Sequence, residues 1–231
     1  REGFLSGLPA FGDQEILRIR HYFDNLLTNV LSANDRRNSY SINAYHLVCA
    51  GLYDLILSPV LLDYVEDLLG PDFACWGNHL FCKLPKDRME VPLHQDGTYW
   101  PISPSQTVTV WLALDDANEE NAAMQFVPGS HLGGPLPHDD LPLDGTRVLK
   151  RQVTDPERYS ERFTNSLRAG EISIHSDHKR TVTSRVFVNV ICDQILILYD
   201  FLFRSSISFN MLFLEEIWSR NFTNLFIAPL K

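Results

Sequence analysis

The run QTVTVWLALDD at residues 106–116 repeats its branched apolar residues with a period of two. Val108, Val110, Leu112 and Leu114 would lie on one face of an extended chain, so the run predicts a strand with one face in a hydrophobic core. Further segments have the composition of strands and are separated by turns rich in Gly and Pro: residues 75–84, 122–128 and 171–176. The middle of the chain is therefore predicted to be mainly β.

The N-terminal third is predicted to be helical. Apolar residues recur at helical spacing at about residues 13–31, and a second helix is expected at residues 46–57. The third, at residues 59–69, begins with Ser58 as a possible cap and Pro59 in the first turn. A helical front followed by many short strands indicates a β-sandwich or a jelly roll braced by helices.

Composition limits the classes of partner. Of the 231 residues, 45% are hydrophobic and 21% are charged, as in an ordinary globular domain. The net charge of −9 argues against nucleic acid or an anionic membrane as a partner, because both attract basic patches. No segment resembles a signal peptide, and the four cysteines form no Cys-x-x-Cys pair. They are interpreted as free thiols in a reducing compartment, which predicts a cytoplasmic protein.

A candidate metal site lies in the sequence HQDGTYW at residues 94–100. Residues i and i+2 of a strand point to the same face, so His94 and Asp96 would direct an imidazole and a carboxylate to one point. Non-haem iron(II) oxygenases bind their metal through two histidines and one carboxylate and keep the opposite side open. The pair would supply two of these ligands, although His-x-Asp also occurs as an exposed histidine beside an aspartate.

The surrounding sequence resembles the phytanoyl-CoA dioxygenase family. After HQD at residues 94–96 come an aromatic pair, Tyr99 and Trp100, then the strand TVWLALDD, and then NAAMQFVPGSH at residues 121–131. The opening segment GFLSGLPAFGDQEILRIRHYFDNLL is similar to the first strand and helix of that family. The resemblance covers about residues 3–177.

This resemblance implies a double-stranded β-helix, a jelly roll of the cupin type, that uses Fe(II), 2-oxoglutarate and O2 to hydroxylate a small organic substrate. It implies His94 and Asp96 as metal ligands, with no catalytic residue beyond the ligands. The side chains expected at the cosubstrate are Gln95, Trp111, Lys83 and Arg185. Those expected at the substrate pocket are Tyr99 and Trp100. The residues alone also allow Trp111 to be a core aromatic and Lys83 a solvated lysine. His131 is interpreted as a turn residue.

The third metal ligand is absent from its expected position. The family pattern continues from GEISIHSD at residues 170–177 to a His-Gly-Ser ligand five or six residues after His175, then to an arginine that pairs with 2-oxoglutarate. In this chain the ligand position is Arg180 or Thr181, and neither side chain is suitable. His178, two or three residues early, is the remaining candidate, whereas His175 matches the upstream histidine of the pattern.

Residues 178–231 are interpreted as an atypical tail that replaces the last strands after a domain at residues 1–177, which leaves the jelly roll incomplete. The segment at residues 186–218 is apolar and poor in turn residues, and it is predicted to be helical or loosely attached. Its charged residues exclude a membrane span. A change of reading frame, an unspliced segment, or true divergence would each produce such a tail.

Three functions therefore remain open. The first is a 2-oxoglutarate-dependent dioxygenase with a small-molecule substrate. The second is a non-catalytic, truncated or frame-altered family member that acts at most as a binding module. The third is another jelly-roll metalloprotein, such as a cupin-like isomerase, which needs a denser histidine cluster. Because the third ligand and the arginine are out of register, we expect little or no turnover of 2-oxoglutarate.

Overall fold

The computed structural model describes residues 2–32, 42–43, 45–83, 88–100, 107–142, 144–176, 180–183 and 190–199, with the backbone alone described at 30–32, 42–43, 180–183 and 190–199. The strands are β1 (Phe4–Pro9), β2 (Ile42–Asn43), β3 (Phe73–Lys83), β4 (Val91–Gln95), β5 (Thr107–Ala113), β6 (Met124–Phe126), β7 (His138–Asp140), β8 (Arg151–Val153), β9 (Phe163–Thr164), β10 (Glu171–Ser176), β11 (Arg180–Thr183) and β12 (Val190–Tyr199). The helices are α1 (Asp13–Ser32), α2 (Ala50–Ile56) and α3 (Pro59–Leu69), with 3₁₀ turns η1 (Tyr45–Leu47), η2 (Asp96–Tyr99), η3 (Glu119–Asn121), η4 (Ser130–Gly133) and η5 (Pro156–Arg158).

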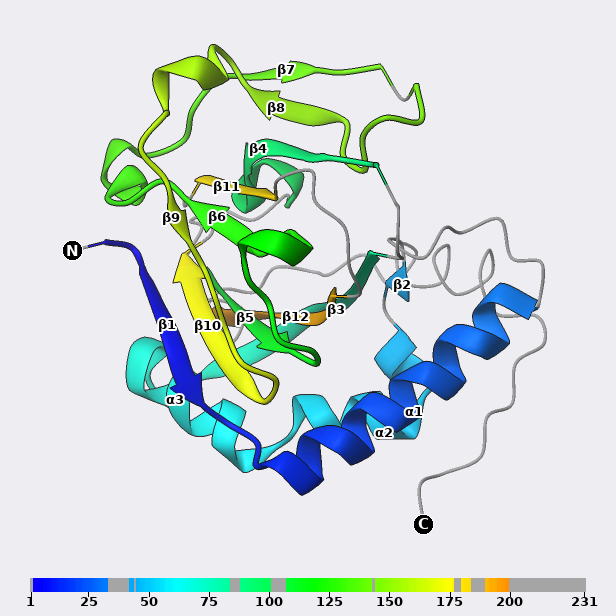
Figure 1. Cartoon of the computed structure of the whole chain (residues 1–231). Helices are drawn as coiled ribbons and strands as arrows, with labels where there is room; N and C mark the ends of the chain where they lie inside the picture. The colour runs from blue at the N-terminus through cyan, green and yellow to red at the C-terminus, as the bar shows by residue number, and fades with distance from the viewer. Residues whose placement is uncertain are drawn as a thin grey trace, which may run out of the picture.

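The strands form two larger sheets and a ribbon (Figure 1). The six-stranded sheet has the order β1-β10-β5-β12-β3-β2, the four-stranded sheet has the order β4-β11-β6-β9, and β7 pairs with β8. Every ladder between these strands is antiparallel. The mainly β prediction is confirmed, and the predicted strands appear as β3, β5, β6 and β10.

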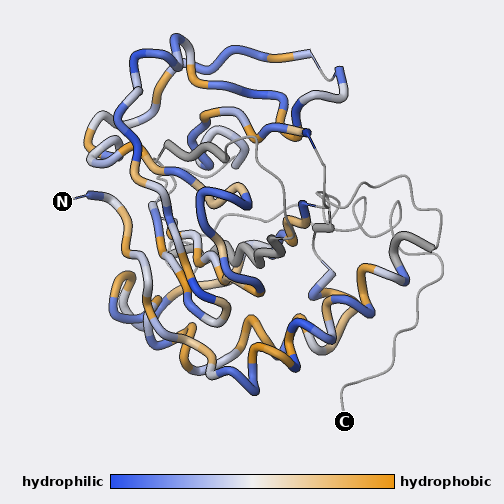
Figure 2. The backbone as a smooth tube through the Cα atoms, in the orientation of Figure 1, coloured by the Kyte–Doolittle hydropathy of each residue, from blue (hydrophilic) through white to orange (hydrophobic). Residues whose placement is uncertain are grey.

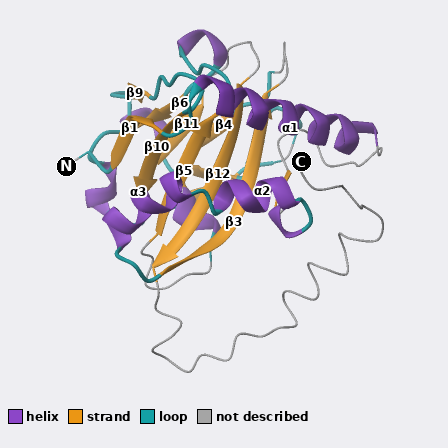
Figure 3. Ribbon diagram, turned by 90° about the horizontal axis from the view of Figure 1, so that it is seen from below, coloured by secondary structure: helices purple, strands orange, loops and turns teal. Residues whose placement is uncertain are grey.

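The three helices cover one face of the six-stranded sheet (Figure 3). The first and third predicted helices are confirmed by α1 and α3. The second is broken into η1 and α2, because Cys49 between them has extended dihedral angles, with φ −112° and ψ 102°. None of the helices in the described part of the chain is long and apolar enough to cross a membrane.

The main hydrophobic core lies between these helices and the sheet. Apolar and polar residues alternate along α1 (Figure 2), and its buried residues Ile16, Phe23 and Leu26 belong to this core. From β5 the core takes Val110 and Leu112, which confirms the face predicted from the period of two. The intervening residues of β5 therefore face the opposite side, toward the four-stranded sheet.

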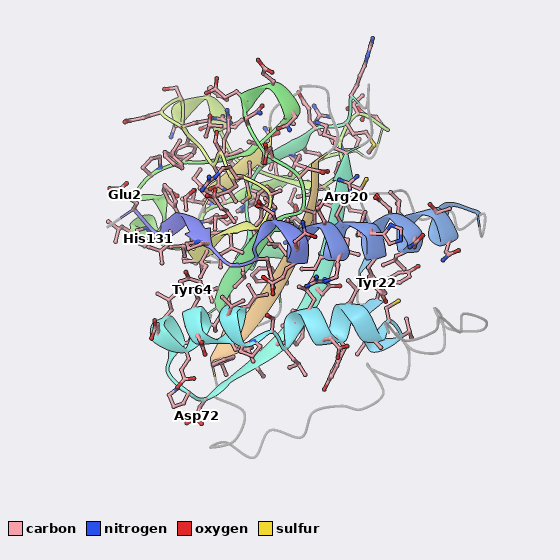
Figure 4. The ribbon with its side chains drawn as sticks, turned by 60° about the horizontal axis from the view of Figure 1, so that its bottom comes forward. Glu2, Arg20, Tyr22, Tyr64, Asp72 and His131 are labelled. Atoms are coloured by element: carbon pink, nitrogen blue, oxygen red, sulfur yellow. The ribbon has the colours of Figure 1, made fainter. Side chains whose placement is uncertain are left out.

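Long-range polar contacts attach α1 to its neighbours. The guanidinium of Arg20 pairs with Asp115, which follows β5, and it also bonds Asp24 on the same helix at 3.1 Å. Figure 4 labels Arg20 on one side of α1 and Tyr22 on the side toward α2. Helix α1 thus contacts both the sheet and the second helix.

The helical prediction for the tail is wrong at Val190–Tyr199. This segment forms β12, which pairs along its length with β3 and β5 in the interior of the six-stranded sheet. A strand with neighbours on both edges and cover on its faces reads as a continuous apolar run, and such a run cannot be distinguished from a buried helix by periodicity. The rest of residues 186–218 lies outside the described residues, and the division of the chain at residue 177 stays a prediction.

Candidate metal site between the two sheets

His94 and Asp96 converge as predicted, although only the first lies in a strand. His94 belongs to β4, and Asp96 begins the turn η2 after Gln95, whose φ of −109° and ψ of 133° keep the chain extended up to the turn. The two side chains are buried, with 7% and 5% of the residue surface exposed. The Nε2 atom of His94 lies 3.0 Å from Oδ1 of Asp96.

The hydrogen bonds of His94 assign its tautomer. Its Nδ1 lies 2.8 Å from the carbonyl oxygen of Pro92, which can only accept, so Nδ1 carries the hydrogen and donates it. In the neutral ring, Nε2 then presents a lone pair to the Asp96 carboxylate. Two lone pairs at this distance repel unless a proton or a metal cation lies between them. A backbone carbonyl that orients the far nitrogen is also the usual partner of a metal-binding histidine.

The spacing of these two atoms fits a divalent ion. Two ligands that each lie about 2.1 Å from one ion, at a right angle to each other, are about 3.0 Å apart. The His94 and Asp96 atoms have this separation, so they fit two positions around Fe(II). Across the described ranges, no three side chains of His, Cys, Asp or Glu are arranged to hold a metal ion.

The second carboxylate oxygen of Asp96 faces the six-stranded sheet. Oδ2 accepts a hydrogen bond from the hydroxyl of Thr109 at 3.3 Å and lies 3.1 Å from Nε2 of His175. Burial by itself raises the pKa of Asp96, but the hydrogen bond from His175 and the contact with His94 outweigh it and hold the pKa well below its ordinary value. The site therefore keeps an ionised carboxylate between the two sheets.

The side chain of Gln95 is occupied by the backbone of a nearby loop. Its amide nitrogen donates to the carbonyl of Gly134 at 3.0 Å, and its amide oxygen accepts from the N–H of Leu136 at 2.8 Å. Its own N–H donates to Nε2 of His138, whose Nδ1 donates to the Leu136 carbonyl. Burial lowers the pKa of His138, which favours the neutral ring that this contact requires. These hydrogen bonds give Gln95 a role in holding the loop that contains Gly134 and Leu136.

Trp111 and Lys83 lie on the site-facing side of the six-stranded sheet. Trp111 alternates with the core residues of β5 and packs in a second apolar cluster with Met124 and Phe126. Lys83 ends β3 on the face opposite Cys82 and is 8% exposed, so it is a buried residue and not a solvated lysine. Both residues remain compatible with the cosubstrate side of the site.

Of the predicted aromatic pair, Tyr99 lies beside His94, and both Tyr99 and Trp100 are partly exposed. The ring of Tyr99 meets the His94 ring edge-on, with 5.7 Å between centroids, and its hydroxyl donates to the carbonyl of Arg151 at 3.3 Å. Burial raises the pKa of Tyr99 to about 12. The Arg151 guanidinium donates back to the carbonyl of Thr98 at 2.8 Å. These bonds attach the β7–β8 ribbon to η2, whereas Trp100 follows the turn and donates its N–H to Gly97.

The ladder of β11 explains the missing third ligand. In this antiparallel pair Thr181 stands opposite His94, and Arg180 stands opposite Gln95. Of the two positions counted from the family pattern, Thr181 is therefore the one opposite His94. His178 and Arg185, the other predicted site residues of this region, lie outside the described residues.

His131 lies in the turn η4, as predicted. The N–H of Gly129, in the same turn, donates to the carbonyl of Glu2 at 3.0 Å, and Figure 4 places the labelled residues Glu2 and His131 close together. A Cβ on Gly3 would lie 2.2 Å from Nδ1 of His131, so this close approach requires glycine. The turn thus packs on the N-terminal strand.

Two residues of the site were not predicted. His175 was taken only as part of a pattern, and Thr109 was not considered, yet both contact Asp96. The period of two contained a signal for Thr109, because it is a polar residue on the face of β5 opposite the valines. His175 likewise alternates with Ile174, a core residue.

Comparisons with known proteins agree with the resemblance. The family described as phytanoyl-CoA dioxygenase (PhyH) matches residues 20–184. The peroxisomal phytanoyl-CoA dioxygenase of Bos taurus is 35% identical over 118 residues, which is 49% of this chain and 35% of that protein. A probable alpha-ketoglutarate-dependent hypophosphite dioxygenase of Stutzerimonas stutzeri is 29% identical over 96 residues, 42% of this chain and 33% of that protein. The chain thus spans about a third of the length of the curated relatives it matches.

Solved structures share the fold. The non-heme monooxygenase ThoJ, without ligand, superposes with a TM-score of 0.72 at 24% identity, over 86% of this chain and 74% of that chain. The non-heme alpha ketoglutarate dependent carbocyclase SnoK gives 0.68 at 19% identity, over 86% of this chain and 81% of that chain. These likenesses concern the fold alone. With its family match across most of the described strands, the chain belongs to the phytanoyl-CoA dioxygenase family.

Proposed function

We propose that this chain is an Fe(II)- and 2-oxoglutarate-dependent dioxygenase that hydroxylates a small organic substrate, with slow turnover in its present form. The observation that carries the proposal is the 3.0 Å separation between His94 Nε2 and Asp96 Oδ1, with the lone pair of His94 directed at the carboxylate. Family membership supplies the reaction class.

The fold is proposed to be the jelly roll, or double-stranded β-helix, expected from the sequence. Its two antiparallel sheets face each other at the site, because Asp96 of the four-stranded side contacts Thr109 and His175 of the six-stranded sheet. The epimerase SnoN, a neighbour of similar fold, is described in complex with Fe3+, alpha ketoglutarate and nogalamycin RO. That description supports, by analogy, a metal and cosubstrate between the sheets here.

Residues of this chain would bind and orient the reactants. His94 and Asp96 would hold the metal, which when bound supplies oxygen activation with 2-oxoglutarate as the electron donor. Lys83 is buried on the site-facing side of β3, where its ammonium suits a carboxylate of the cosubstrate. Tyr99 and the β7–β8 ribbon would bound the substrate side, because Arg151 attaches this ribbon to the turn that carries Asp96.

The compartment and partners are part of the proposal. Among the side chains that the structure describes, Cys49, Cys75 and Cys82 form no disulfide, which suits the reducing cytoplasm expected from the sequence. The proposed partner is a small molecule, and the net charge of −9 does not favour nucleic acid or an anionic membrane.

A non-catalytic binding module is the second candidate. The observation that favours it is Thr181 at the ladder position opposite His94, which is one of the two positions where the resemblance to the family puts the ligand histidine. Such a chain would bind metal weakly and would not turn over 2-oxoglutarate.

Succinate formation from 2-oxoglutarate with Fe(II) and O2 tests the proposal. We expect slow turnover above the metal-free background, abolished by His94→Ala and by Asp96→Ala. The matched control is His46→Gln, which changes a half-buried histidine in the turn η1, on the side of the six-stranded sheet that carries the helices. This variant should retain the turnover of the wild type. A rate equal in the wild type and in His94→Ala would favour the binding module. Rapid turnover abolished by His178→Ala would instead assign the third ligand to His178.

A further inference from the structure

The two oxygens of Asp96 have different surroundings. Oδ1 lies beside His94 Nε2 at 3.0 Å, whereas Oδ2 accepts from Thr109 and lies 3.1 Å from His175 Nε2. Thr109 and His175 stand opposite each other in the ladder between β5 and β10. Two neighbouring residues of the six-stranded sheet therefore reach the same oxygen from the side away from His94.

The two histidines have opposite tautomers. The contact with Pro92 places the ring hydrogen of His94 on Nδ1, so its Nε2 can act as a metal ligand. The Nδ1 of His175 is buried and has no hydrogen-bond partner among the described residues, and its Nε2 faces a carboxylate that only accepts. The ring hydrogen of His175 therefore belongs on Nε2, where it is donated to Asp96.

We propose that His175 is a positioning residue that, with Thr109, occupies Oδ2 of Asp96 and directs Oδ1 toward the metal position beside His94. The inference rests on the proposed function, because its consequence is for metal binding. A carboxylate with both oxygens turned to the ion can bind through two atoms and take an additional coordination position. In this reaction class those positions are needed by 2-oxoglutarate and O2. His175 and Thr109 keep Asp96 a one-atom ligand.

His175 is unsuited to bind the metal itself. Coordination through Nε2 would move the ring hydrogen to Nδ1, where the described residues offer no acceptor in a site that is 1% exposed. The ring of Phe126 packs against this imidazole, with 5.1 Å between centroids, and restricts its rotation. His175 thus orients the metal ligand Asp96 on the opposite side of the site and does not itself bind the metal.

Titration with Co(II), followed by its visible absorption, tests this role without requiring activity. His175→Leu removes the donor, and His175→Gln retains an N–H at about the same reach. We expect His175→Leu to weaken Co(II) binding by about 10–100-fold, as the loss of a residue that orients a metal ligand usually does. We also expect a changed absorption spectrum, and His175→Gln should restore both. His46→Gln is the control and should match the wild type.

Melting temperatures of the metal-free variants separate positioning from folding. If His175→Leu and His175→Gln melt alike but only the glutamine binds cobalt like the wild type, the positioning role is supported. If His175→Leu binds cobalt with the affinity and spectrum of the wild type, the inference is overturned. Should His175→Leu fail to fold, Thr109→Val and Thr109→Ser provide the same comparison for the second donor.

A measurement on the metal-free protein keeps the inference distinct from the proposed function. Ring ¹⁵N signals of labelled histidine, with His175 assigned through His175→Gln, report which nitrogen carries hydrogen. We expect hydrogen on Nε2 of His175. Hydrogen on Nδ1 with a bare Nε2 overturns the inference whatever the metal affinity. If the wild type binds no cobalt while Nε2 carries the hydrogen, the proposed function fails and the orientation of Asp96 by His175 stands.

Discussion

Replacing Thr181 with histidine should convert the pair at residues 94 and 96 into a three-ligand site. Thr181 lies opposite His94 in one ladder and opposite Phe126 in the other, so β11 has a neighbour on each side. Residues directly opposite each other in an antiparallel pair have Cβ atoms about 4.5–5.5 Å apart. An imidazole at position 181 would begin within reach of an ion that His94 holds at about 2.1 Å.

The size of the effect follows from the number of ligands. Losing a residue that merely orients a metal ligand costs about 10–100-fold in affinity, and a direct ligand should be worth at least as much. We therefore expect Thr181→His to tighten Co(II) binding by about 10–100-fold, equivalent to about 1.4–2.8 kcal/mol. The cost of exchanging these residues in a strand is at most about 1 kcal/mol, so the fold should tolerate the change.

Titration with Co(II) and succinate formation with Fe(II) measure the outcome. The matched control is Arg180→His, which puts the same imidazole one ladder position away, opposite Gln95. Asp96→Ala combined with Thr181→His should lose the gain. If Thr181→His binds cobalt no more tightly than Arg180→His, then either the register of β11 or the count of two protein ligands is wrong.

Further outcomes follow from the same contacts. A chain ending at Thr183 lacks both ladders of β12, and it should melt at a far lower temperature than one ending at Tyr199; equal melting temperatures would contradict the interior position of that strand. Gln95→Leu should destabilise the metal-free protein by about 0.5–1.5 kcal/mol for each hydrogen bond lost, namely those to the part-buried Gly134 carbonyl and Leu136 N–H, in chemical denaturation; an effect confined to 2-oxoglutarate binding would instead favour a role at the cosubstrate. Because burial raises the pKa of Tyr99 to about 12, the stability it contributes is complete below its ordinary pKa of about 10 and is lost as pH rises through 12, so Tyr99→Phe should remove that alkaline loss in melting curves.

Local patterns in the sequence were sufficient where one element determines its own geometry. The period of two predicted β5 and its core face, and the Ser58-Pro59 pair predicted the start of α3. The convergence of His94 and Asp96 was also predicted, because only Gln95 separates them and its extended backbone preserves their common direction. Such features depend on few residues and on no distant partner.

The tertiary structure decided what depends on distant pairing. An apolar segment such as Val190–Tyr199 has the same composition whether it is a helix or a central strand, and only the unsatisfied edges of β3 and β5 select the strand. Likewise Asp96 and His175 are 79 residues apart, and nothing in either local sequence specifies that one carboxylate oxygen meets one imidazole. That contact exists because the two sheets pack face to face, and burial between them favours pairing of the carboxylate oxygen with a hydrogen-bond donor.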